Sequence, residues 1–347
     1  MSVAIVATAP DQASFRAFLG AAGAVRGNDP RWPAGPAELS AFLLAPDAPW
    51  RRHGEAELLV ALAGEAPVGA LVVALDRRAP HGTFGFFDCV NDESIARALM
   101  GAGLTWLRAH GATHAEGPIN LHALGGYRLQ TKGFERAPFL GEPRNPSWYP
   151  ELLTRVGFAR SAGWRSWDFE GWRLMAFRAF HRVQSWRNPR LRRLGYFTEE
   201  MDAARFEEGM ARIYPVVMAC YEGAPAFWHI EVDEYLRLNL PLKGVPGVRG
   251  AMLFKQGIAE PVGFGMGIEE ATRGVMHSFG ILREHRGKGL AHLVLEHAFA
   301  ELRKRTFTSV VGALVKEGSS KYDETGGSPT RRYALYRRDT SPLGAAT

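Results

Sequence analysis

The sequence predicts an α/β (α+β) protein in which one unit, a mixed β-sheet with flanking helices, is used twice. Three observations predict it. Apolar runs separated by turn residues recur in the same order in both halves, each set leads into a segment of helical periodicity, and a further apolar run follows each helix. A strand, a helix and a strand in that order imply a parallel pair with a right-handed crossover inside a mixed sheet. The length of 347 residues fits two domains at about 150 residues each.

The elements of the first half are read from these patterns in chain order. Strands are expected at residues 57–63, 68–75 and 83–90, a helix at 93–110 and a further strand at 114–119. Gly111 is a natural stop for the helix because glycine adopts the left-handed conformation that ends helices.

The second half repeats the order. Strands are expected at residues 250–254, 262–268 and 275–282, a helix at 289–304 and a strand at 309–315. Ala66-Pro67-Val68-Gly69 and Glu260-Pro261-Val262-Gly263 lie 194 residues apart, and the shared element order favours a duplication over two unrelated hairpins.

The expected domains are residues 1–170 and 198–347, joined by a basic linker helix at 171–197. This helix is predicted to end before Asn188-Pro189, because proline restricts the residue before it. Its arginines suit a solvated linker, and contact with a membrane surface or with nucleic acid through 173–193 are the two alternatives. They are Arg173, Arg178, Arg182, Arg187, Arg190, Arg192 and Arg193.

Composition excludes several classes of protein. No apolar run approaches the roughly 18–20 residues of a membrane span, and the first residues do not read as a secretory signal. Cys89 and Cys220 are the only cysteines, too few for a disulfide framework or a cysteine-rich zinc site. We therefore expect a cytoplasmic protein, with peripheral contact at the inner membrane surface as the alternative. The net charge of +6 is a weak indication of an anionic partner.

The most specific local feature is Arg286-Gly287-Lys288-Gly289-Leu290-Ala291, between an expected strand and an expected helix. Glycines let the backbone approach a ligand closely, and the N–H groups at a helix N-terminus bind phosphate oxygens. The spacing matches neither a Walker loop nor the dinucleotide fingerprint. A structural turn at a helix entry would look similar.

This loop resembles that of the GNAT acyl-CoA N-acyltransferase superfamily, whose pyrophosphate motif is [Q/R]-x-x-G-x-[G/A]. Arg286, Gly289 and Ala291 fill its fixed positions, and Tyr322, four residues before Gly326, matches a second family element. The family's asparagine upstream of that tyrosine is absent, since Val315 stands there.

The whole chain also resembles a bacterial tandem-GNAT group, to which bacterial ceramide synthases are related. The motifs that carry this resemblance are Asp29-Pro30-Arg31-Trp32, Gly117-Pro118-Ile119-Asn120, Asn145-Pro146-Ser147-Trp148-Tyr149 and Val156-Gly157-Phe158.

The resemblance implies two tandem GNAT-like domains and an N-acyltransferase that uses acetyl-CoA or a longer acyl-CoA and no metal. Backbone groups near Phe279, Ile281 and Leu282 would bind the pantetheine arm, and residues 287–291 (Gly287, Lys288, Gly289, Leu290 and Ala291) would bind the pyrophosphate, with Arg286 and Lys288 adding positive charge. Tyr322 would protonate the leaving thiolate.

The acceptor is expected to be a small-molecule or lipid amine, which must lose a proton to a base before or during attack. Glu269 and His277 are the candidate bases, with Glu270, His229 and Glu231 as further candidates. Each of them is more often a surface charge or a structural histidine.

The first half departs from the family where chemistry would lie. Asn91-Asp92-Glu93-Ser94 replaces the glycine loop and would repel a pyrophosphate, and Leu153 stands where the tyrosine is expected. Our hypothesis is that this half does not bind CoA and supports the fold or shapes the acceptor pocket.

Two other functions remain open at this point: an aminoacyl-tRNA-dependent transferase on the same fold, and a non-catalytic protein that binds acyl-CoA. DNA is not expected as a partner. Residues 331–338 are expected to form a final strand with exposed arginines, with attraction of the CoA phosphates as the alternative.

Overall fold

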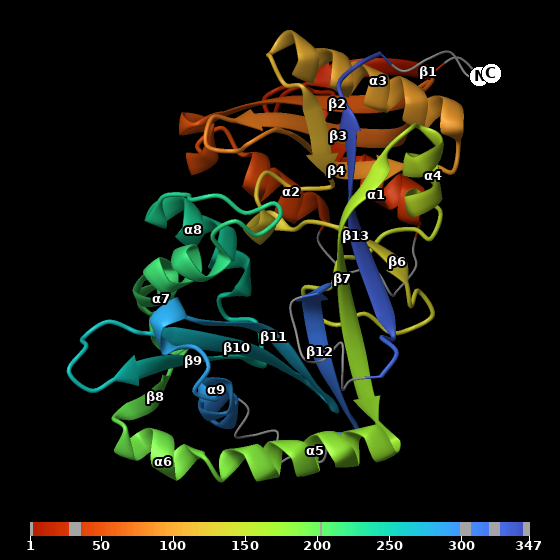
Figure 1. Ribbon diagram of the computed structural model, residues 1–347. Coiled ribbons are helices and arrows are strands. Elements are labelled where there is room, and N and C mark those ends of the chain that lie inside the picture. The colour runs from red at the N-terminus through yellow and green to blue at the C-terminus, as the bar shows by residue number, and fades with distance from the viewer. Residues whose placement is uncertain (1–2, 28–35, 202, 299–306, 319–326, 343–347) are drawn as a thin grey trace. The chain divides into compact units, whose positions relative to one another are not determined.

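The computed structural model describes residues 3–27, 36–201, 203–298, 307–318 and 327–342. These residues form two compact units. Unit 1 comprises residues 1–163, 225–228 and 331–347, and unit 2 comprises residues 164–224 and 229–330. Figure 1 labels the elements of both units.

Unit 1 contains the strands of the first half and the last strand of the chain. Its strands are β1 (Val3–Thr8), β2 (Gly54–Ala63), β3 (Ala66–Asp76), β4 (Gly82–Cys89), β5 (His114–Gly117), β6 (Leu129–Lys132) and β13 (Arg331–Asp339). Its helices are α1 (Phe15–Arg26), α2 (Pro36–Leu44), α3 (Glu93–Ala109) and α4 (Tyr149–Arg155), with 3-10 turns at Pro49–Arg52 and Ala123–Gly125. Strand β7 (Ala159–Glu170) begins in unit 1 and continues into unit 2.

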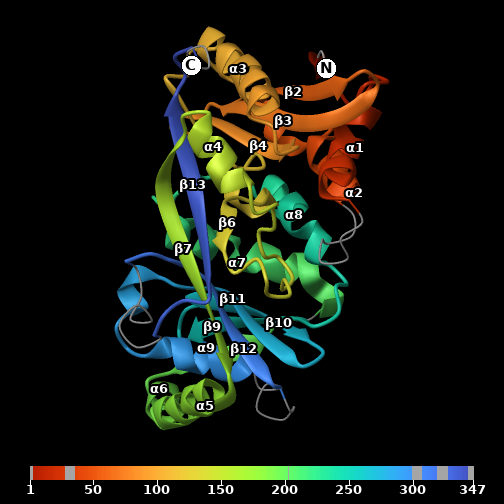
Figure 2. The same ribbon diagram turned by 90° about the vertical axis from the view of Figure 1, so that its right-hand side faces the viewer.

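The sheet of unit 1 has the order β1-β2-β3-β4-β5-β13, and β6 also pairs with β13. The β4–β5 pair is parallel and its neighbours are antiparallel, as the strand–helix–strand order predicts. Helices α3 and α4 pack on the core cluster that includes Leu71, Val73 and Leu99, and Figure 2 shows α1 on the side of the sheet opposite α3. Strand β5 ends at Gly117, two residues earlier than predicted, because Pro118 has no N–H to continue the ladder.

Unit 2 contains the strands of the second half. Its strands besides β7 are β8 (Tyr196–Glu200), β9 (Val248–Lys255), β10 (Gly263–Glu270), β11 (Arg273–Ile281) and β12 (Ser309–Lys316). Its helices are α5 (Gly171–Ser185), α6 (Asn188–Arg193), α7 (Phe206–Tyr221), α8 (Val232–Asn239) and α9 (Leu290–Ala298), with 3-10 turns at Ala203–Arg205, Leu240–Leu242 and Arg283–His285. The order is β7-β12-β11-β10-β9-β8, and β11 and β12 are the parallel pair.

Helices α7 and α9 cover opposite faces of the unit 2 sheet, as Figure 1 shows. Leu290, Leu293 and Val294 of α9 are buried in one cluster with Leu253 and Ile281 of the sheet. On the other face, Cys220 Sγ of α7 lies 2.9 Å from the point where a Cβ of Gly280 on β11 would stand. The predicted repeat of strands, helix and strand is therefore confirmed in both units, and the part of the second predicted helix beyond Ala298 lies outside the described residues.

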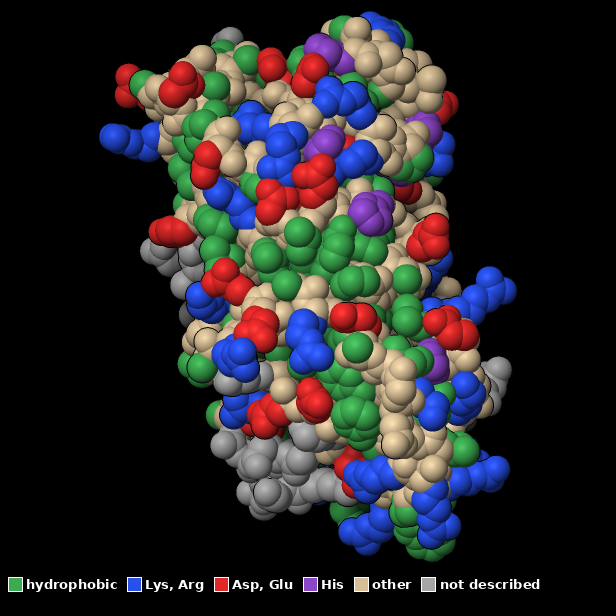
Figure 3. Space-filling model, turned by 90° about the vertical axis from the view of Figure 1, so that its left-hand side faces the viewer, with side chains coloured by type: hydrophobic (Ala, Val, Ile, Leu, Met, Phe, Trp, Pro, Cys, Tyr) green, Lys and Arg blue, Asp and Glu red, His purple; other side chains and the backbone are tan. Residues whose placement is uncertain are grey.

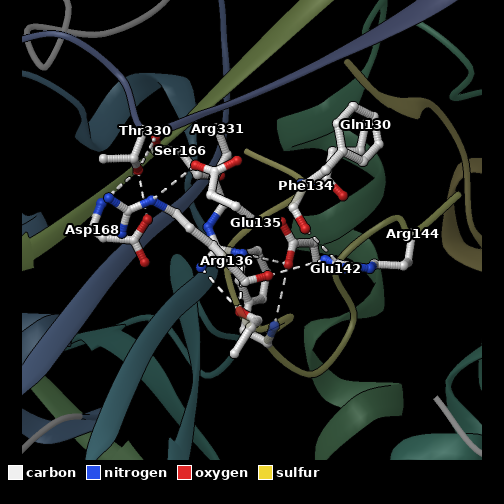
Figure 4. A network of polar contacts seen from close by, with 12 residues as sticks. Gln130, Phe134, Glu135, Arg136, Glu142, Arg144, Ser166, Asp168, Thr330 and Arg331 are labelled. Carbon is white, nitrogen blue, oxygen red and sulfur yellow. Dashed lines mark hydrogen bonds and ion pairs between the residues drawn. The ribbon is translucent and has the colours of Figure 1, made fainter. Parts of the chain in front are cut away.

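Strand β13 is the largest departure from the expected organisation, because it pairs with β5 and β6 of unit 1. The expectation that the arginines of this strand are exposed is wrong for Arg331. Its side chain is 1% exposed and donates to the Glu142 carboxylate at 2.7 Å (Figure 4). Tyr333 donates to the other oxygen of Glu142 at 2.6 Å. A buried charge has to be paired, and this pair fixes the last strand in unit 1.

Candidate functional site

The candidate site of unit 2 lies where the parallel strands β11 and β12 separate. Their ladder runs from Arg273 and Ser309 to Met276 and Gly312, although both strands continue beyond it. Strand β12 is irregular at this point, because its register with β7 shifts between Gly312 and Val315. Leu314 has a φ of 57°, and its N–H donates to Ser166 Oγ at 2.9 Å. Among the residues that the structure describes, the end of β11 at residues 278–281 therefore pairs with β10 and not with β12.

The end of β11 contains the residues expected to bind pantetheine. Phe279 is 47% exposed, Ile281 is buried and Leu282 is half-buried. Ile281 anchors the strand end, because its side chain belongs to the core beneath α9. An extended strand with one unpaired edge is suited to hydrogen bonding an extended ligand along its backbone.

The glycine loop follows directly and leads into α9. Gly287 and Gly289 have φ values of 78° and 83°, which residues with a Cβ rarely adopt. No acidic residue lies in the first turn of α9, so the positive end of the helix dipole is not offset there by a carboxylate of its own. The loop therefore brings backbone N–H groups and a helix N-terminus together, which is the arrangement that binds phosphate oxygens.

The two cationic side chains of the loop are held by the protein. Arg286 Nε donates to the Ile281 carbonyl at 2.8 Å, which ties the loop back to β11. Lys288 Nζ lies 3.1 Å from both the Tyr196 hydroxyl and the Glu284 carbonyl. These two side chains brace the loop, so the backbone N–H groups are the main candidate ligands of an anion.

A buried histidine completes the support beneath the loop. His285 Nδ1 lies 2.9 Å from the Tyr196 hydroxyl, and burial together with Lys288 lowers the pKa of the His285 imidazole. Arg187, which follows α5, lies near the loop as well, 3.9 Å from the point where a Cβ of Gly289 would stand. Sequence reasoning assigned Arg187 to the linker, and only its distance from Gly289 associates it with the loop.

His277 occupies a β-bulge at the point of separation. Met266 pairs with Ser278 and Gly267 pairs with Met276, so His277 is the extra residue of β11. Its Nδ1 lies 2.8 Å from Ser278 Oγ. Bulges frequently reorient a side chain beside an active site, and this bulge lies where β11 and β12 separate.

Glu269 lies elsewhere on the sheet. It pairs with Gly274, whereas Gly263 at the other end of β10 pairs with Ile281 beside the loop. Six residues of strand separate these ends, about 20 Å. The Glu269 carboxylate is buried, 3.7 Å from Arg249 Nε, and Glu270 forms an ion pair with Arg273. The structure therefore does not bring Glu269 and the loop together.

The remaining candidate bases lie around α7 and α8. His229 Nε2 is 3.4 Å from the Tyr214 hydroxyl, which donates to the Ile230 carbonyl at 2.8 Å. Burial and the nearby carboxylates of Glu231 and Glu234 raise the pKa of Tyr214. Tyr214 and Glu234 were not singled out from the sequence, since a tyrosine or glutamate on a helix gives no distinguishing pattern.

Tyr322, the residue expected to protonate the thiolate, belongs to a segment outside the described residues. Gly326 and the motif at 29–32 lie outside them as well. Within the described ranges, no group of three His, Cys, Asp or Glu side chains could hold a metal ion. No helix in those ranges is both long and apolar enough to cross a membrane.

The corresponding opening in unit 1 is closed by its own side chains. Beyond the short β4–β5 ladder, the Phe86 N–H donates to Asn120 Oδ1 at 2.7 Å. The Cys89 N–H donates to the Tyr149 hydroxyl at 2.9 Å, and Trp148 Nε1 donates to the Cys89 carbonyl at 3.2 Å. The two motifs at 117–120 and 145–149 therefore occupy the edge of β4 that the equivalent strand of unit 2 leaves open.

The N-terminus of α3 is closed in the same way. Asp92 Oδ1 accepts from the N–H groups of Ser94 and Ile95 at 2.8 and 3.2 Å, and Glu93 adds a second carboxylate. Hydrogen bonds from the Ser94 hydroxyl and from these N–H groups lower the pKa of Asp92, so the carboxylate is ionised at neutral pH. An anion at this helix would have to displace the cap and approach two negative charges.

Comparison with known proteins gives matches that agree with this geometry. Residues 210–319, which include β11, the loop and β12, match the family model described as Acetyltransferase (GNAT) family. A bacterial ceramide synthase of Caulobacter vibrioides (strain NA1000 / CB15N) is 27% identical over 157 residues, 43% of this chain and 41% of that protein. Protein YghO of Escherichia coli (strain K12) is 29% identical over 86 residues, 25% of this chain and 22% of that protein. The matches thus span less than half the length of either relative.

A solved structure covers the whole fold. The tandem GNAT protein from the clavulanic acid biosynthesis pathway (without AcCoA) has a TM-score of 0.60 at 15% identity, over 99% of this chain and 100% of its own. At this identity the likeness concerns the fold alone. Residues 210–319 therefore match the GNAT acetyltransferase family model, and nearly the whole chain has a fold like that of the tandem GNAT protein.

Proposed function

We propose that the protein is an acyl-CoA-dependent N-acyltransferase whose donor site lies in unit 2. The observation that carries the proposal is the separation of β11 from β12 directly before a glycine loop that leads into α9. Pantetheine would lie along the open edge of β11 at residues 279–282. The pyrophosphate would bind the N–H groups of residues 287–291, with Arg286, Lys288 and Arg187 contributing positive charge.

The reaction would be direct transfer. The amine nitrogen attacks the thioester carbonyl carbon, the C–S bond breaks as the tetrahedral intermediate collapses, and the amine proton passes to a base. We place His277 in that role, directly or through a water molecule, because the bulge sets it at the mouth of the opening. Tyr322 remains the predicted donor of a proton to the thiolate sulfur.

The acceptor class is proposed from a relative. A bacterial ceramide synthase, by its name, acts in lipid chemistry, and this supports a lipid amine over a small soluble amine for the present chain. The same proposal includes a long acyl chain on the donor, because a lipid product fits a long-chain acyl-CoA.

The loop can be tested against an equally strained control. In Gly287→Val the valine would have to adopt a φ of 78°, and in Gly64→Val, in the β2–β3 turn, a φ of 65°. At either position a Cβ would meet no atom within 4 Å, so the two substitutions differ little in steric contact. The strain costs about 1–2 kcal/mol at each position. We expect Gly287→Val to weaken acyl-CoA binding at least about tenfold, and Gly64→Val to lower stability without changing affinity.

The measurements are calorimetric titration and thiol release with donors from acetyl-CoA to palmitoyl-CoA. Wild-type turnover separates an enzyme from a protein that only binds acyl-CoA. If Gly287→Val binds every donor as tightly as wild type does, the loop is not the pyrophosphate site.

A further inference from the structure

The outer face of α5 exposes a stripe of large apolar side chains. Trp172, Met175, Val183 and Trp186 are 76%, 67%, 57% and 77% exposed. Their spacing of three, eight and three residues places them on one side of the helix. Water-exposed apolar surface of this extent on one helix face is unusual for a protein that meets only solvent.

The inner face of the same helix already packs on unit 2. Leu174 is buried in a cluster with Trp167 and Val310, and the ring of Phe177 stacks on Phe169 at 4.7 Å. His181 lies 5.2 Å from His292 of α9, measured between ring centroids. The exposed stripe is therefore a second apolar face, in addition to the one that the fold uses.

Arginines flank the stripe and continue into α6. Residues 171–198 contain seven arginines and no Asp or Glu. Arg178 and Arg192 are bound to the Phe307 carbonyl and to Glu296. Arg182, Arg190 and Arg193 are exposed, and the described part of the chain offers them no carboxylate partner. Figure 3 shows basic side chains gathered at its lower end.

The combination of features selects one kind of partner. A second copy of this surface would bring seven more arginines against the first seven, and the charges would repel. A nucleic acid would bind the arginines, but the apolar side chains of Met175 and Val183 would stay exposed to water. An anionic bilayer accepts the apolar stripe at the acyl boundary, the tryptophans at the headgroup level and the arginines at the lipid phosphates.

We infer that α5 and α6 dock unit 2 on an anionic membrane surface, with Trp172, Met175, Val183 and Trp186 inserted and the arginines on lipid phosphates. The donor site is coupled to this surface through α9. The ring of Phe180 lies 5.8 Å from that of His292, and Asn188 and Arg192 both contact Glu296. The helix that follows the glycine loop thus packs directly on the docking surface, which suits a lipid acceptor, although docking itself does not depend on the proposed chemistry.

Vesicle co-sedimentation of the full chain tests the inference. We expect binding to vesicles that contain phosphatidylglycerol, little binding to phosphatidylcholine alone, and a loss of binding as salt rises. Arg182→Gln with Arg190→Gln removes two exposed charges, and about five-fold per arginine predicts roughly 25-fold weaker partitioning. Trp172→Ser with Trp186→Ser should also weaken binding, and in this pair the charge is unchanged.

The matched control is Arg16→Gln with Arg108→Gln, which makes the same change in net charge at exposed positions of α1 and α3. The control should bind vesicles as wild type does, and all variants should keep the wild-type unfolding temperature. Equal binding by the α5–α6 variants and the control would overturn the inference. So would wild-type protein that ignores anionic vesicles, or that binds transfer RNA and not vesicles.

Discussion

The two units contain the same strand opening and treat it in opposite ways. In unit 2 the bulge of β11 carries His277, and the strand edge beyond it has no partner strand among the described residues. In unit 1 the bulged part of β4 carries Phe86, and Asn120, Trp148 and Tyr149 bind the edge. The same strand–helix–strand arrangement occurs in both units, and side chains fill the strand edge in unit 1. The difference teaches that a unit can keep the same arrangement of strands and helix while its own side chains fill the strand edge where a ligand could bind.

The helix N-termini repeat the contrast. The first turn of α9 has no acidic residue and follows two left-handed glycines, whereas α3 is capped by Asp92. Both helices pack on the sheet in the same order of elements, so the ability to bind an anion depends on a few residues at the helix entry.

The largest effect is expected at the open bulge. His277→Gln keeps a hydrogen-bonding side chain beside Ser278 but removes the base, and we expect turnover to fall about 100-fold or more with acyl-CoA affinity unchanged. Steady-state kinetics that separate kcat from KM give the measurement. Glu269→Gln is the comparison variant, since its carboxylate lies near Arg249 and away from the loop; a fall in turnover there, with His277→Gln active, would assign the base to Glu269.

A smaller effect is expected when Tyr149, one of the side chains that bind the edge of β4 in unit 1, is changed. Tyr149 is fully buried, accepts from the Cys89 N–H and donates to Asp88 at 2.9 Å. Tyr149→Phe should lower the free energy of unfolding by about 1–3 kcal/mol, because two buried polar groups lose a partner. Chemical denaturation measures this loss. The affinity for acyl-CoA should stay at its wild-type value, and a large change in that affinity would mean that unit 1 takes part in donor binding.

The smallest effect is expected at the cap of α3. Asp92→Ala leaves the Ser94 and Ile95 N–H groups without their acceptor and should cost about 1 kcal/mol of stability. Asp11→Ala, at an exposed carboxylate before α1, makes the same charge change and should cost less. Thermal unfolding compares the two. New acyl-CoA binding by the Asp92→Ala protein, at a second site, would show that the cap alone excludes the ligand.

Much of the fold could be predicted because the signals are local. Strands β2, β3, β4, β9, β10 and β11 and helix α3 agree with the apolar patterns to within a few residues, and α5 ends before Asn188-Pro189 as predicted. Elements outside the repeat, such as β7 and α7, were not predicted. Their apolar residues lack a turn signal or a matching counterpart in the other half, and α7 contains Pro215.

The site could be predicted in part. The loop at 286–291 and the strand before it were identified from glycine, charge and family resemblance, and His277 was among the candidate bases. Strand register pairs Glu269 with Gly274, whereas His277 lies three residues further along β11, closer to the loop. The sequence pattern alone does not fix this register. The expected assignment of 198–347 to one domain also differs from the compact units, since residues 331–347 belong to unit 1.

The sequence by itself determined the order of elements, the glycine loop and the acidic replacement in the first half. These follow from hydrophobic periodicity and from the backbone freedom of single residues, which act over a few positions. Only the tertiary structure decided that Tyr149 closes the edge of β4 from 60 residues away, that Arg331 fixes β13 beside β5, and that Trp172 and Trp186 face outward. Such facts depend on contacts between distant segments, which no local pattern encodes.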